Sequence, residues 1–272
     1  MDNYIITDKE FKLFADLVYT KTGINLFDGN KKQLVQSRVS KVLRKRDIAS
    51  YKAYYDIIQA DNSGDELMEF INLISTNVTN FFREEKHFDF MKAVWHPHFH
   101  YRHSEPVRIW CAASSSGEEP YSISITMQEL VGDKYPYDIF ATDISTKVLN
   151  LAKKAIYPEK AVENLDKNLV RKYFQKGSGN AAGYVKVKPA VANHVRFDKL
   201  NLIEPFTHKV NYDMIFCRNV MIYFDGPTKE KIINRFYDFM HPGAYLMIGH
   251  SESLNGLKHP FQYVQPATYR KV

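Results

Sequence analysis

The architecture of this chain follows from the segment Val107-Arg-Ile-Trp-Cys-Ala-Ala-Ser-Ser-Ser-Gly117-Glu-Glu-Pro-Tyr121. Its first six residues predict a buried strand over 107–112 that runs into a turn of small residues. A helix is expected to begin near Glu118, because Pro120 falls in its first turn, where a missing N–H costs nothing. Such a turn at a helix N-terminus holds nucleotide-type cofactors in α/β proteins. Only Gly117 remains of the Gly-x-Gly-x-x-Gly pattern, so an ordinary strand-to-helix connection fits equally well here.

Composition and charge describe a soluble globular chain that favours acidic partners. The 272 residues can form one large domain or two smaller ones, and 44% of them are apolar. No apolar run approaches the roughly 20 residues of a membrane span, and the first residues lack a signal-peptide layout. Cys111 and Cys217 lie in apolar runs, which predicts buried reduced thiols in a cytosolic protein. The net charge of +6 and the pI near 9.0 favour nucleic acid, anionic membrane or an acidic protein surface.

The first 75 or so residues predict a small helical bundle. Thr7 and Glu10 form a capping-box pattern, and Gly23 suits the end of the helix that follows. A second helix is expected over 31–46, and two more near 50–60 and 64–75.

The predicted helix over 31–46 has a basic face and contains no acidic residue. A solvated surface is the ordinary explanation for such a run. Seven unpartnered charges of one sign would repel one another, so we favour binding to an acidic partner. The basic residues are Lys31, Lys32, Arg38, Lys41, Arg44, Lys45 and Arg46.

Beyond residue 105, buried strands alternate with helices, a pattern that is typical of a parallel α/β sheet. Two short alternating segments, 184–188 and 194–197, interrupt this order and predict an antiparallel insertion. The other expected strands are 107–112, 137–143, 212–219, 244–249 and 261–270.

Polar residues gather at the predicted carboxyl ends of these strands, where ligands bind in open parallel sheets. Asp143 ends its predicted strand. In dinucleotide-binding folds, an acid at this position, about 20 residues beyond the glycine turn, binds ribose hydroxyls. Neither a nucleophile elbow nor a Gly-Lys-Ser/Thr phosphate loop is found. The sequence therefore predicts a nucleotide-like cofactor site without a phosphate cradle. The polar residues at these ends are Ser114 to Glu118, Asp143, Asn201, Arg218, Asn219 and 250–253.

Four histidines between His96 and His103 raise the possibility of a metal site. Their spacing is two, two and three, and no Cys, Asp or Glu lies among them. We favour a loop and expect no metal.

The chain resembles, over essentially its full length, the chemotaxis receptor glutamate methyltransferases, the CheR-type enzymes. Many members have Gly-Cys where this chain has Ala113-Ser114, a difference expected to narrow the cofactor turn without abolishing binding. The matching motifs are Asn77-Val-Thr-Asn-Phe-Phe-Arg-Glu84, Ser116-Gly-Glu-Glu-Pro-Tyr-Ser122, Ala141-Thr-Asp-Ile144, Phe216-Cys-Arg-Asn-Val-Met-Ile-Tyr-Phe224 and Gly249-His-Ser-Glu-Ser253.

The resemblance implies a fold of three parts. A helical receptor-docking domain would cover 1–76, and a linker over 77–92 would contribute to the cofactor site. A Rossmann-like class I methyltransferase domain would cover 93–272, with a small antiparallel β-subdomain inserted at about 180–200.

The resemblance also implies the chemistry. S-adenosylmethionine would be the cofactor, without a metal, and the substrates would be glutamate side chains of chemoreceptors, which become methyl esters. Arg83 and Tyr223 would lie nearest the reacting methyl, and Arg38, Lys41, Arg44 and Arg46 would dock the acidic receptor. The cofactor-contacting residues would be Asn77, Thr79, Arg83, Glu118, Asp143, Asn201, Leu202, Arg218 and Asn219.

The expected partners are methyl-accepting receptors, and the protein is expected in the cytoplasm at their arrays. We expect a monomer that binds no nucleic acid and does not insert into the membrane. The β-subdomain docks a receptor-tail peptide in some members, and the glycine-rich loop 177–183 resembles theirs. Two alternatives remain: a nucleic-acid methyltransferase, which the basic pI suits, and a non-catalytic receptor-binding adaptor. This chain has neither the Asn/Asp-Pro-Pro-Tyr/Phe segment of amino-directed DNA methyltransferases nor a catalytic Pro-Cys pair, which argues against the first alternative. It retains Glu118, Asp143, Arg83 and Tyr223, which argues against the second.

Overall fold

The contacts of the chain divide it into two compact units. The computed structural model describes residues 4–27, 31–75, 77–95, 105–207 and 210–272, so the histidine run 96–103 lies outside the described residues. The first unit comprises Met1–Thr76 with Tyr223–Lys229, and the second comprises Asn77–Ile222 with Glu230–Val272. No helix within these described ranges is long and apolar enough to cross a membrane.

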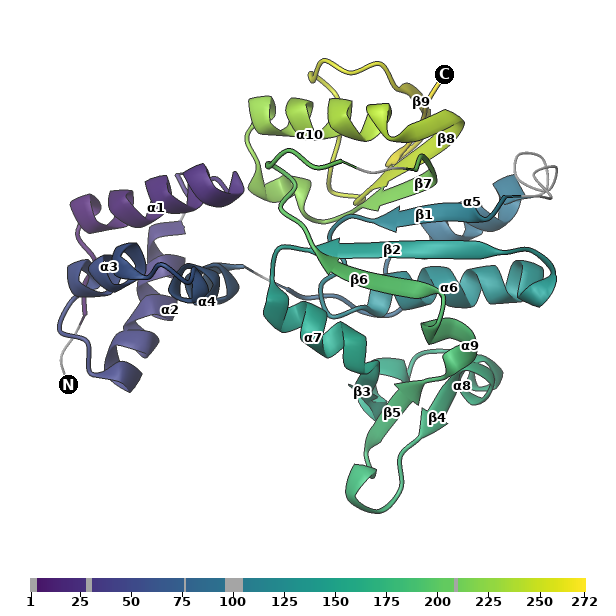
Figure 1. Ribbon diagram of the computed structural model, residues 1–272, viewed down its shortest axis with the longest axis horizontal. Helices are drawn as coiled ribbons and strands as arrows, with labels where there is room; N and C mark the ends of the chain where they lie inside the picture. The colour runs from purple at the N-terminus through teal and green to yellow at the C-terminus, as the bar shows by residue number, and fades with distance from the viewer. Residues whose placement is uncertain (1–3, 28–30, 76, 96–104, 208–209) are drawn as a thin grey trace. The chain divides into compact units, whose positions relative to one another are not determined.

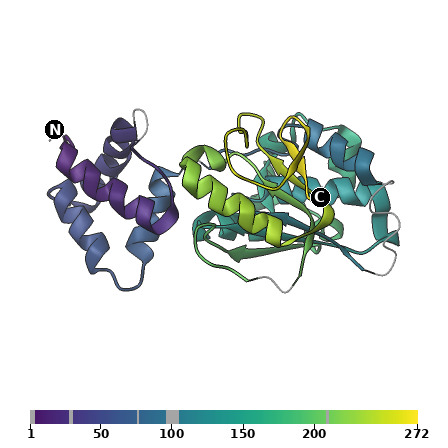
Figure 2. The same ribbon diagram turned by 90° about the horizontal axis from the view of Figure 1, so that it is seen from above.

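The first unit is a bundle of four helices (Figures 1 and 2). The capping box at its start is confirmed: the Thr7 hydroxyl accepts the Glu10 N–H, and the Glu10 carboxylate accepts the Thr7 N–H. Gly23 ends the first helix in the left-handed region, with φ 73°. The helices are α1 (Asp8–Thr22), α2 (Lys31–Arg46), α3 (Tyr51–Ala60) and α4 (Asp65–Ile74).

Aromatic rings fill the centre of this bundle. Phe14 of α1 is fully buried, and its ring centroid lies 5.0 Å from that of Phe70 and 6.2 Å from that of Tyr54. A short segment from late in the sequence joins the same unit. The carbonyl of Tyr223 accepts the backbone N–H of Asn25 at 2.8 Å.

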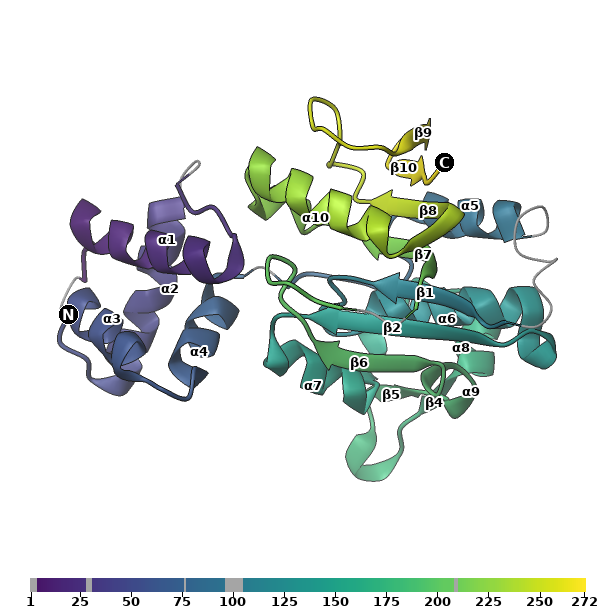
Figure 3. The same ribbon diagram turned by 45° about the horizontal axis from the view of Figure 1, so that its top comes forward.

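The second unit is built on a seven-stranded sheet in the order β6-β2-β1-β7-β8-β10-β9, with helices on both faces (Figures 1 and 3). The first five strands in this order are parallel, and β10 and β9 add an antiparallel edge. The expected Rossmann-like arrangement is confirmed. The strands are β1 (Val107–Cys111), β2 (Tyr137–Asp143), β6 (Val195–Lys199), β7 (Tyr212–Cys217), β8 (Met240–Ile248), β9 (Gln262–Gln265) and β10 (Thr268–Arg270), and the longer helices are α5 (Lys86–Val94), α6 (Glu118–Val131), α7 (Thr146–Lys154) and α10 (Gly226–Asp238).

Strand β1 is buried on both faces, as its apolar run predicts. Ile109 and Cys111 point to the side covered by α5 and α6, where they join a large apolar cluster. Trp110, between them, points to the other side and packs edge-on against Phe236 of α10 at 5.1 Å. Successive side chains alternate across a strand, so one short segment anchors both layers of helices.

A second, three-stranded antiparallel sheet follows α7, and here the expected boundaries are wrong. Residues 184–187 of the first segment do belong to this sheet, but residues 195–197 of the second lie in β6, which pairs in parallel with β2 of the main sheet. The insertion therefore begins before residue 180. The prediction missed its first two strands because they are too short to show alternation. The elements between α7 and β6 are β3 (Ile156–Pro158), α8 (Lys167–Tyr173), β4 (Phe174–Lys176), β5 (Tyr184–Val187) and α9 (Pro189–Ala192).

The end of the chain also differs from the expectation of one strand over 261–270. Pro266 and Ala267 interrupt this segment, and Ala267 has a positive φ of 60°, so the chain reverses into the hairpin β9–β10. Strand β8 begins at Met240, before the predicted start at 244, and contains Gly243. Both thiols are confirmed as buried and free.

The basic face of α2 is partly neutralised within the first unit, so the expectation of seven unpartnered charges is wrong. The Arg46 guanidinium lies 2.6 Å from the Glu66 carboxylate of α4, and Lys32 Nζ lies 2.5 Å from Asp8. These acids are distant in sequence, and periodicity alone could not assign them. Among the described residues, the cations of this face without an ion-pair partner include Lys41, Arg44 and Lys45.

Arg38 is a structural residue of the bundle, because Nη1 donates to the carbonyls of Leu73 and Ser75 at 2.8 and 2.9 Å. Carbonyls at the end of α4 have no partner within the helix, so Arg38 satisfies them. Replacing Arg38 with Ala should weaken the last turn of α4 by about 1.5–3 kcal/mol, the usual contribution of hydrogen bonds to a charged group. Amide hydrogen exchange of residues 70–75 measures this loss. Lys41→Ala on the same helix is the control, and equal protection in both variants would contradict the assignment.

Candidate cofactor site at the strand ends

The turn between β1 and α6 is held in a shape that needs glycine. Gly117 has φ 99°, and a Cβ there would lie 2.8 Å from the Tyr157 hydroxyl and 2.9 Å from Ala152 Cβ. The same hydroxyl donates to the Ser116 carbonyl at 2.7 Å, so the small sheet supports the turn. Backbone N–H groups at the start of α6 can therefore approach a ligand closely.

Asp143 lies where the sequence predicts it, at the carboxyl end of β2 beside this turn. One carboxylate oxygen accepts the Ser115 N–H and the other accepts the Ser145 N–H, each at 2.9 Å. Burial raises the pKa of Asp143, and the hydrogen bonds from Ser145 and Ser115 oppose this effect. Each carboxylate oxygen has a second lone pair, which can accept a further hydrogen bond from a ligand.

Two other polar groups of the turn point to a missing partner. Glu118 begins α6, is about nine-tenths buried and accepts the Ser116 hydroxyl at 2.7 Å. Burial raises the pKa of the Glu118 carboxyl. The Ser114 hydroxyl is buried and has no hydrogen-bond partner among the described residues. A nucleotide-like ligand at this edge would satisfy such groups.

The segment 77–85 packs against the same turn. The Ser115 hydroxyl donates to the Asn77 carbonyl at 3.2 Å, and the Phe82 N–H donates to Ser122 Oγ of α6 at 2.9 Å. Phe81 anchors the segment in the cluster around the small sheet, with its ring 4.9 Å from that of Tyr157. The polar residues of this segment are therefore held beside the cofactor turn.

Arg218 is the buried centre of the site, with a side chain that is 0% exposed. Its guanidinium donates to the carboxylates of Glu119 and Glu84 and to the carbonyl of Arg83. Burial alone would lower the pKa of Arg218, but Glu119 and Glu84 raise it above its ordinary value. The cofactor contact expected of Arg218 stays a prediction from the motif match. Arg218 joins α6, the 77–85 segment and the end of β7.

The residues after β7 and β8 share a second carboxylate. Glu252 accepts the backbone N–H groups of Asn219, Gly249 and Ile222, and burial raises the pKa of its carboxyl. Asn219 has a positive φ of 57°, and its side-chain amide donates to Glu84 at 3.2 Å. The network fixes Asn219 between two acids.

Glu84 is the common acceptor of this network. Burial opposes its ionisation, but hydrogen bonds from Arg218 and Asn219 hold the pKa of its carboxyl below the ordinary value. Sequence reasoning included Glu252 only as part of the polar segment 250–253, and it singled out neither Glu84 nor Glu119 as a site residue. Acidic residues beside buried apolar segments were the available signal, because a buried carboxylate needs a partner.

Three further predicted residues, Asn201, Leu202 and Thr79, belong to the same unit as this edge. Asn201 and Leu202 follow β6, and the Leu200 N–H beside them donates to the Asp143 carbonyl at 3.1 Å. Thr79 lies half-buried in the segment 77–85. Tyr223 belongs to the first compact unit, so its partnership with Arg83 remains a prediction from the motif match.

The comparisons with known proteins match these two units. The CheR methyltransferase all-alpha domain matches residues 9–75, and the CheR methyltransferase SAM binding domain matches residues 77–270. This chain belongs to the CheR methyltransferase family. A chemotaxis protein methyltransferase of Borreliella burgdorferi is 39% identical, over 99% of this chain and 96% of that protein. One from Salmonella typhimurium is 38% identical, over 94% of this chain and 88% of that protein.

A substitution at Gly117 tests whether the turn between β1 and α6 requires glycine. Gly117→Ala should lower the free energy of unfolding by about 1–2 kcal/mol for the left-handed backbone, and by a further 1–3 kcal/mol or so for the clash with Tyr157 and Ala152. The matched control is Gly256→Ala, because Gly256 has φ 78° but no atom near its missing Cβ. Urea unfolding compares the two variants, and equal losses would show that the turn has room for a side chain.

Proposed function

We propose that this protein transfers a methyl group from S-adenosylmethionine to glutamate side chains of methyl-accepting chemotaxis receptors. The observation that carries the proposal is the position of Asp143, beside the Gly117 turn at the end of β2, in a chain of the CheR methyltransferase family. The products are γ-glutamyl methyl esters and S-adenosylhomocysteine. A cytoplasmic monomer that meets receptors in their arrays is part of the proposal.

The residues of the strand ends suit this cofactor. Asp143 can accept ribose hydroxyls, and Glu118 lies at the start of α6, where it accepts the Ser116 hydroxyl. The Ser114 hydroxyl of the turn has no hydrogen-bond partner within the described part of the chain. The other residues of the proposed set are Asn77, Thr79, Arg83, Asn201, Leu202, Arg218 and Asn219. The Ala113-Ser114 pair keeps small side chains at the turn, which is consistent with binding.

The chemical step needs no general base. When bound, S-adenosylmethionine supplies a methyl group on a positively charged sulfur. A substrate glutamate has a reference pKa of about 4.3 and is ionised at neutral pH, so it is already a nucleophile. The protein must hold that carboxylate in line and exclude water.

Arg83 and Tyr223 are proposed to orient the substrate glutamate. Nη1 of Arg83 donates to the Val78 carbonyl at 2.9 Å, which steadies the guanidinium, and a guanidinium has further donors for a carboxylate. The Tyr223 hydroxyl would add one more donor. Neither residue takes a proton in this mechanism.

The first test concerns the cofactor. Asp143→Ala should weaken binding of S-adenosylmethionine and S-adenosylhomocysteine together, by roughly 1.5–3 kcal/mol for charged hydrogen bonds. Isothermal titration calorimetry measures both affinities. Asp138→Ala is the control, because Asp138 is an exposed acid on the same strand. A folded Asp143 variant with unchanged affinity would remove this residue from the site.

The second test concerns the reaction itself. Labelled methyl should appear in receptor protein as a base-labile ester and not in DNA or RNA, and the single-turnover rate should be flat from about pH 6 to 8. Tyr223→Phe should lower kcat about 10- to 100-fold through looser positioning, with cofactor affinity retained. Transfer to nucleic acid would support the rival methyltransferase, and absence of transfer would support an adaptor. A rising limb near pH 7 would indicate a general base.

The third test concerns receptor docking, which we now assign mainly to Lys41 and Arg44. Arg38 and Arg46 already have partners inside the bundle. Methylatable receptor helices are rich in glutamate, so the remaining cations of this face suit them. Reversing Lys41 and Arg44 to Glu should raise KM for receptor, flatten the salt dependence of the rate and leave cofactor affinity unchanged.

The control for docking reverses two exposed cations elsewhere in the bundle, Lys9 of α1 and Lys52 of α3. It changes net charge by the same amount. Equal effects of the two double variants would show a response to total charge, and no effect of Lys41 and Arg44 would make the face ordinary solvated surface. A receptor-tail peptide on the small sheet remains a further proposal.

A further inference from the structure

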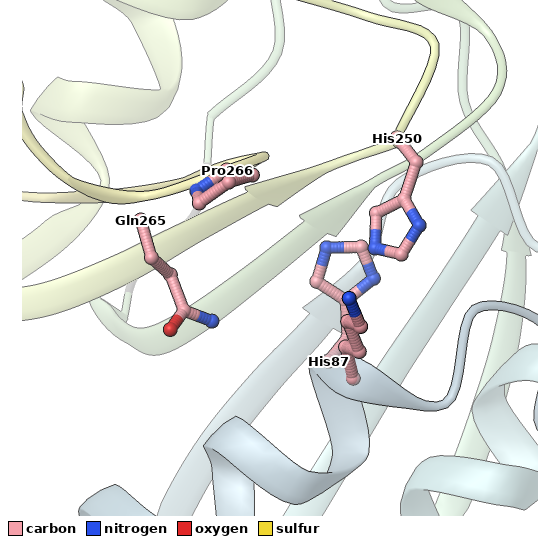
Figure 4. Close-up of a pocket in the computed structure, with 5 residues that line it drawn as sticks. His87, His250, Gln265 and Pro266 are labelled. Carbon is pink, nitrogen blue, oxygen red and sulfur yellow. The ribbon is translucent and has the colours of Figure 1, made fainter.

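A small pocket lies beside the strand-end network, between the start of α5 and the hairpin β9–β10. Lys86, His87, His250, Gln265 and Pro266 line it (Figure 4). The imidazole rings of His87 and His250 lie next to each other there, with centroids 4.8 Å apart and planes inclined by 45°. The two histidines come from different parts of the chain, α5 and the segment after β8.

His87 has an unusual environment for a buried polar side chain. It is 1% exposed, and neither ring nitrogen has a hydrogen-bond partner among the described residues. The Ala267 backbone lies near the ring without hydrogen-bond geometry. The nearest carboxylate, Glu84, is 3.6 Å from Nδ1, which is too long for a hydrogen bond. Because buried polar atoms are nearly always satisfied, this ring requires a partner beyond the described residues.

We propose that Glu84, His87 and His250 form a binding site for a transition-metal ion of the Zn²⁺ type. One potential ligand atom from each residue lies within 4.8 Å of the other two. Two imidazoles with one carboxylate are a donor set that Zn²⁺ uses with an open fourth position. Mg²⁺ and Ca²⁺ prefer oxygen ligands, so the two nitrogens select against them. The exposed side of His250 gives the ion a route to the site.

Neighbouring charges make this site weak and give its occupancy a consequence. Glu84 accepts hydrogen bonds from Arg218, from the Asn219 amide and from the His250 N–H. A bound ion competes with these donors for the same carboxylate, and the positive charges of Lys86 and Arg218 repel it. Metal binding therefore loosens the hold of Glu84 on Asn219, and the site reports on the strand-end network.

The test measures binding of Zn²⁺ and Co²⁺ to the tag-free full chain by calorimetry and by Co²⁺ d–d absorption. One ion per chain is expected. His250→Ala should lower the affinity for the ion at least about 10-fold, because even the loss of a residue that only hydrogen-bonds to a metal ligand lowers metal affinity by about that much. His250 is exposed, so this variant should melt normally in chelator. Glu84→Gln should also weaken binding and abolish any carboxylate ligand.

The four histidines of 96–103 require a matched control, His98→Ala with His100→Ala. Retention of the ion in this control and its loss in His250→Ala support the proposal. Loss in the control with retention in His250→Ala would overturn it, because the ion would then lie on the histidine run. Absence of binding to the unaltered chain would overturn it as well. None of these outcomes depends on methyl transfer.

Discussion

The structure of the second unit depends on the burial of one positive charge. The Arg218 guanidinium has no exposed surface, and it is stable there because Glu119 and Glu84 surround it and the Arg83 carbonyl accepts from it. Removing one partner of a buried ion pair usually costs about 3–5 kcal/mol, because the remaining charge is left uncompensated. Three segments distant in sequence therefore keep their relative positions only as a set.

Two glycine positions also shape the strand ends, because neighbouring protein atoms leave no room for a side chain there. Gly117 lets the β1–α6 turn pass under Tyr157, and Gly249 leaves room for the Asn219 amide, which would lie 2.6 Å from a Cβ at that position. Such positions admit no side chain. The strand ends thus combine one buried charge with two positions where neighbouring protein atoms leave no room for a side chain.

Much of this could be predicted from the sequence, and the failures have physical causes. The helices were predictable where their apolar periodicity is strong, as in α7, and β1 was predictable because it is a short apolar run. Asp143 was predictable because it ends a strand. The insertion was misplaced because β3 and β4 are too short to alternate visibly. The partners of Arg38 and Arg46 could not be predicted, since they lie on α4, and contacts between helices leave no local pattern. The roles of Glu84 and Glu119 could not be predicted, and Glu252 was recognised only within a polar segment, because these roles depend on which strand ends meet.

The shared carboxylate at Glu84 has a consequence for how such sequences can change. The motifs that contain residues 77–84, 116–122, 216–224 and 249–253 are separate in the chain. Arg218, Asn219 and the His250 N–H nevertheless meet at Glu84, and Glu119 of 116–122 joins them through its bond to Arg218. A substitution in one motif alone leaves a buried donor or acceptor unpaired. Descendants of this protein should therefore replace these positions in concert or retain them together, so that four motifs are inherited as a single physical unit.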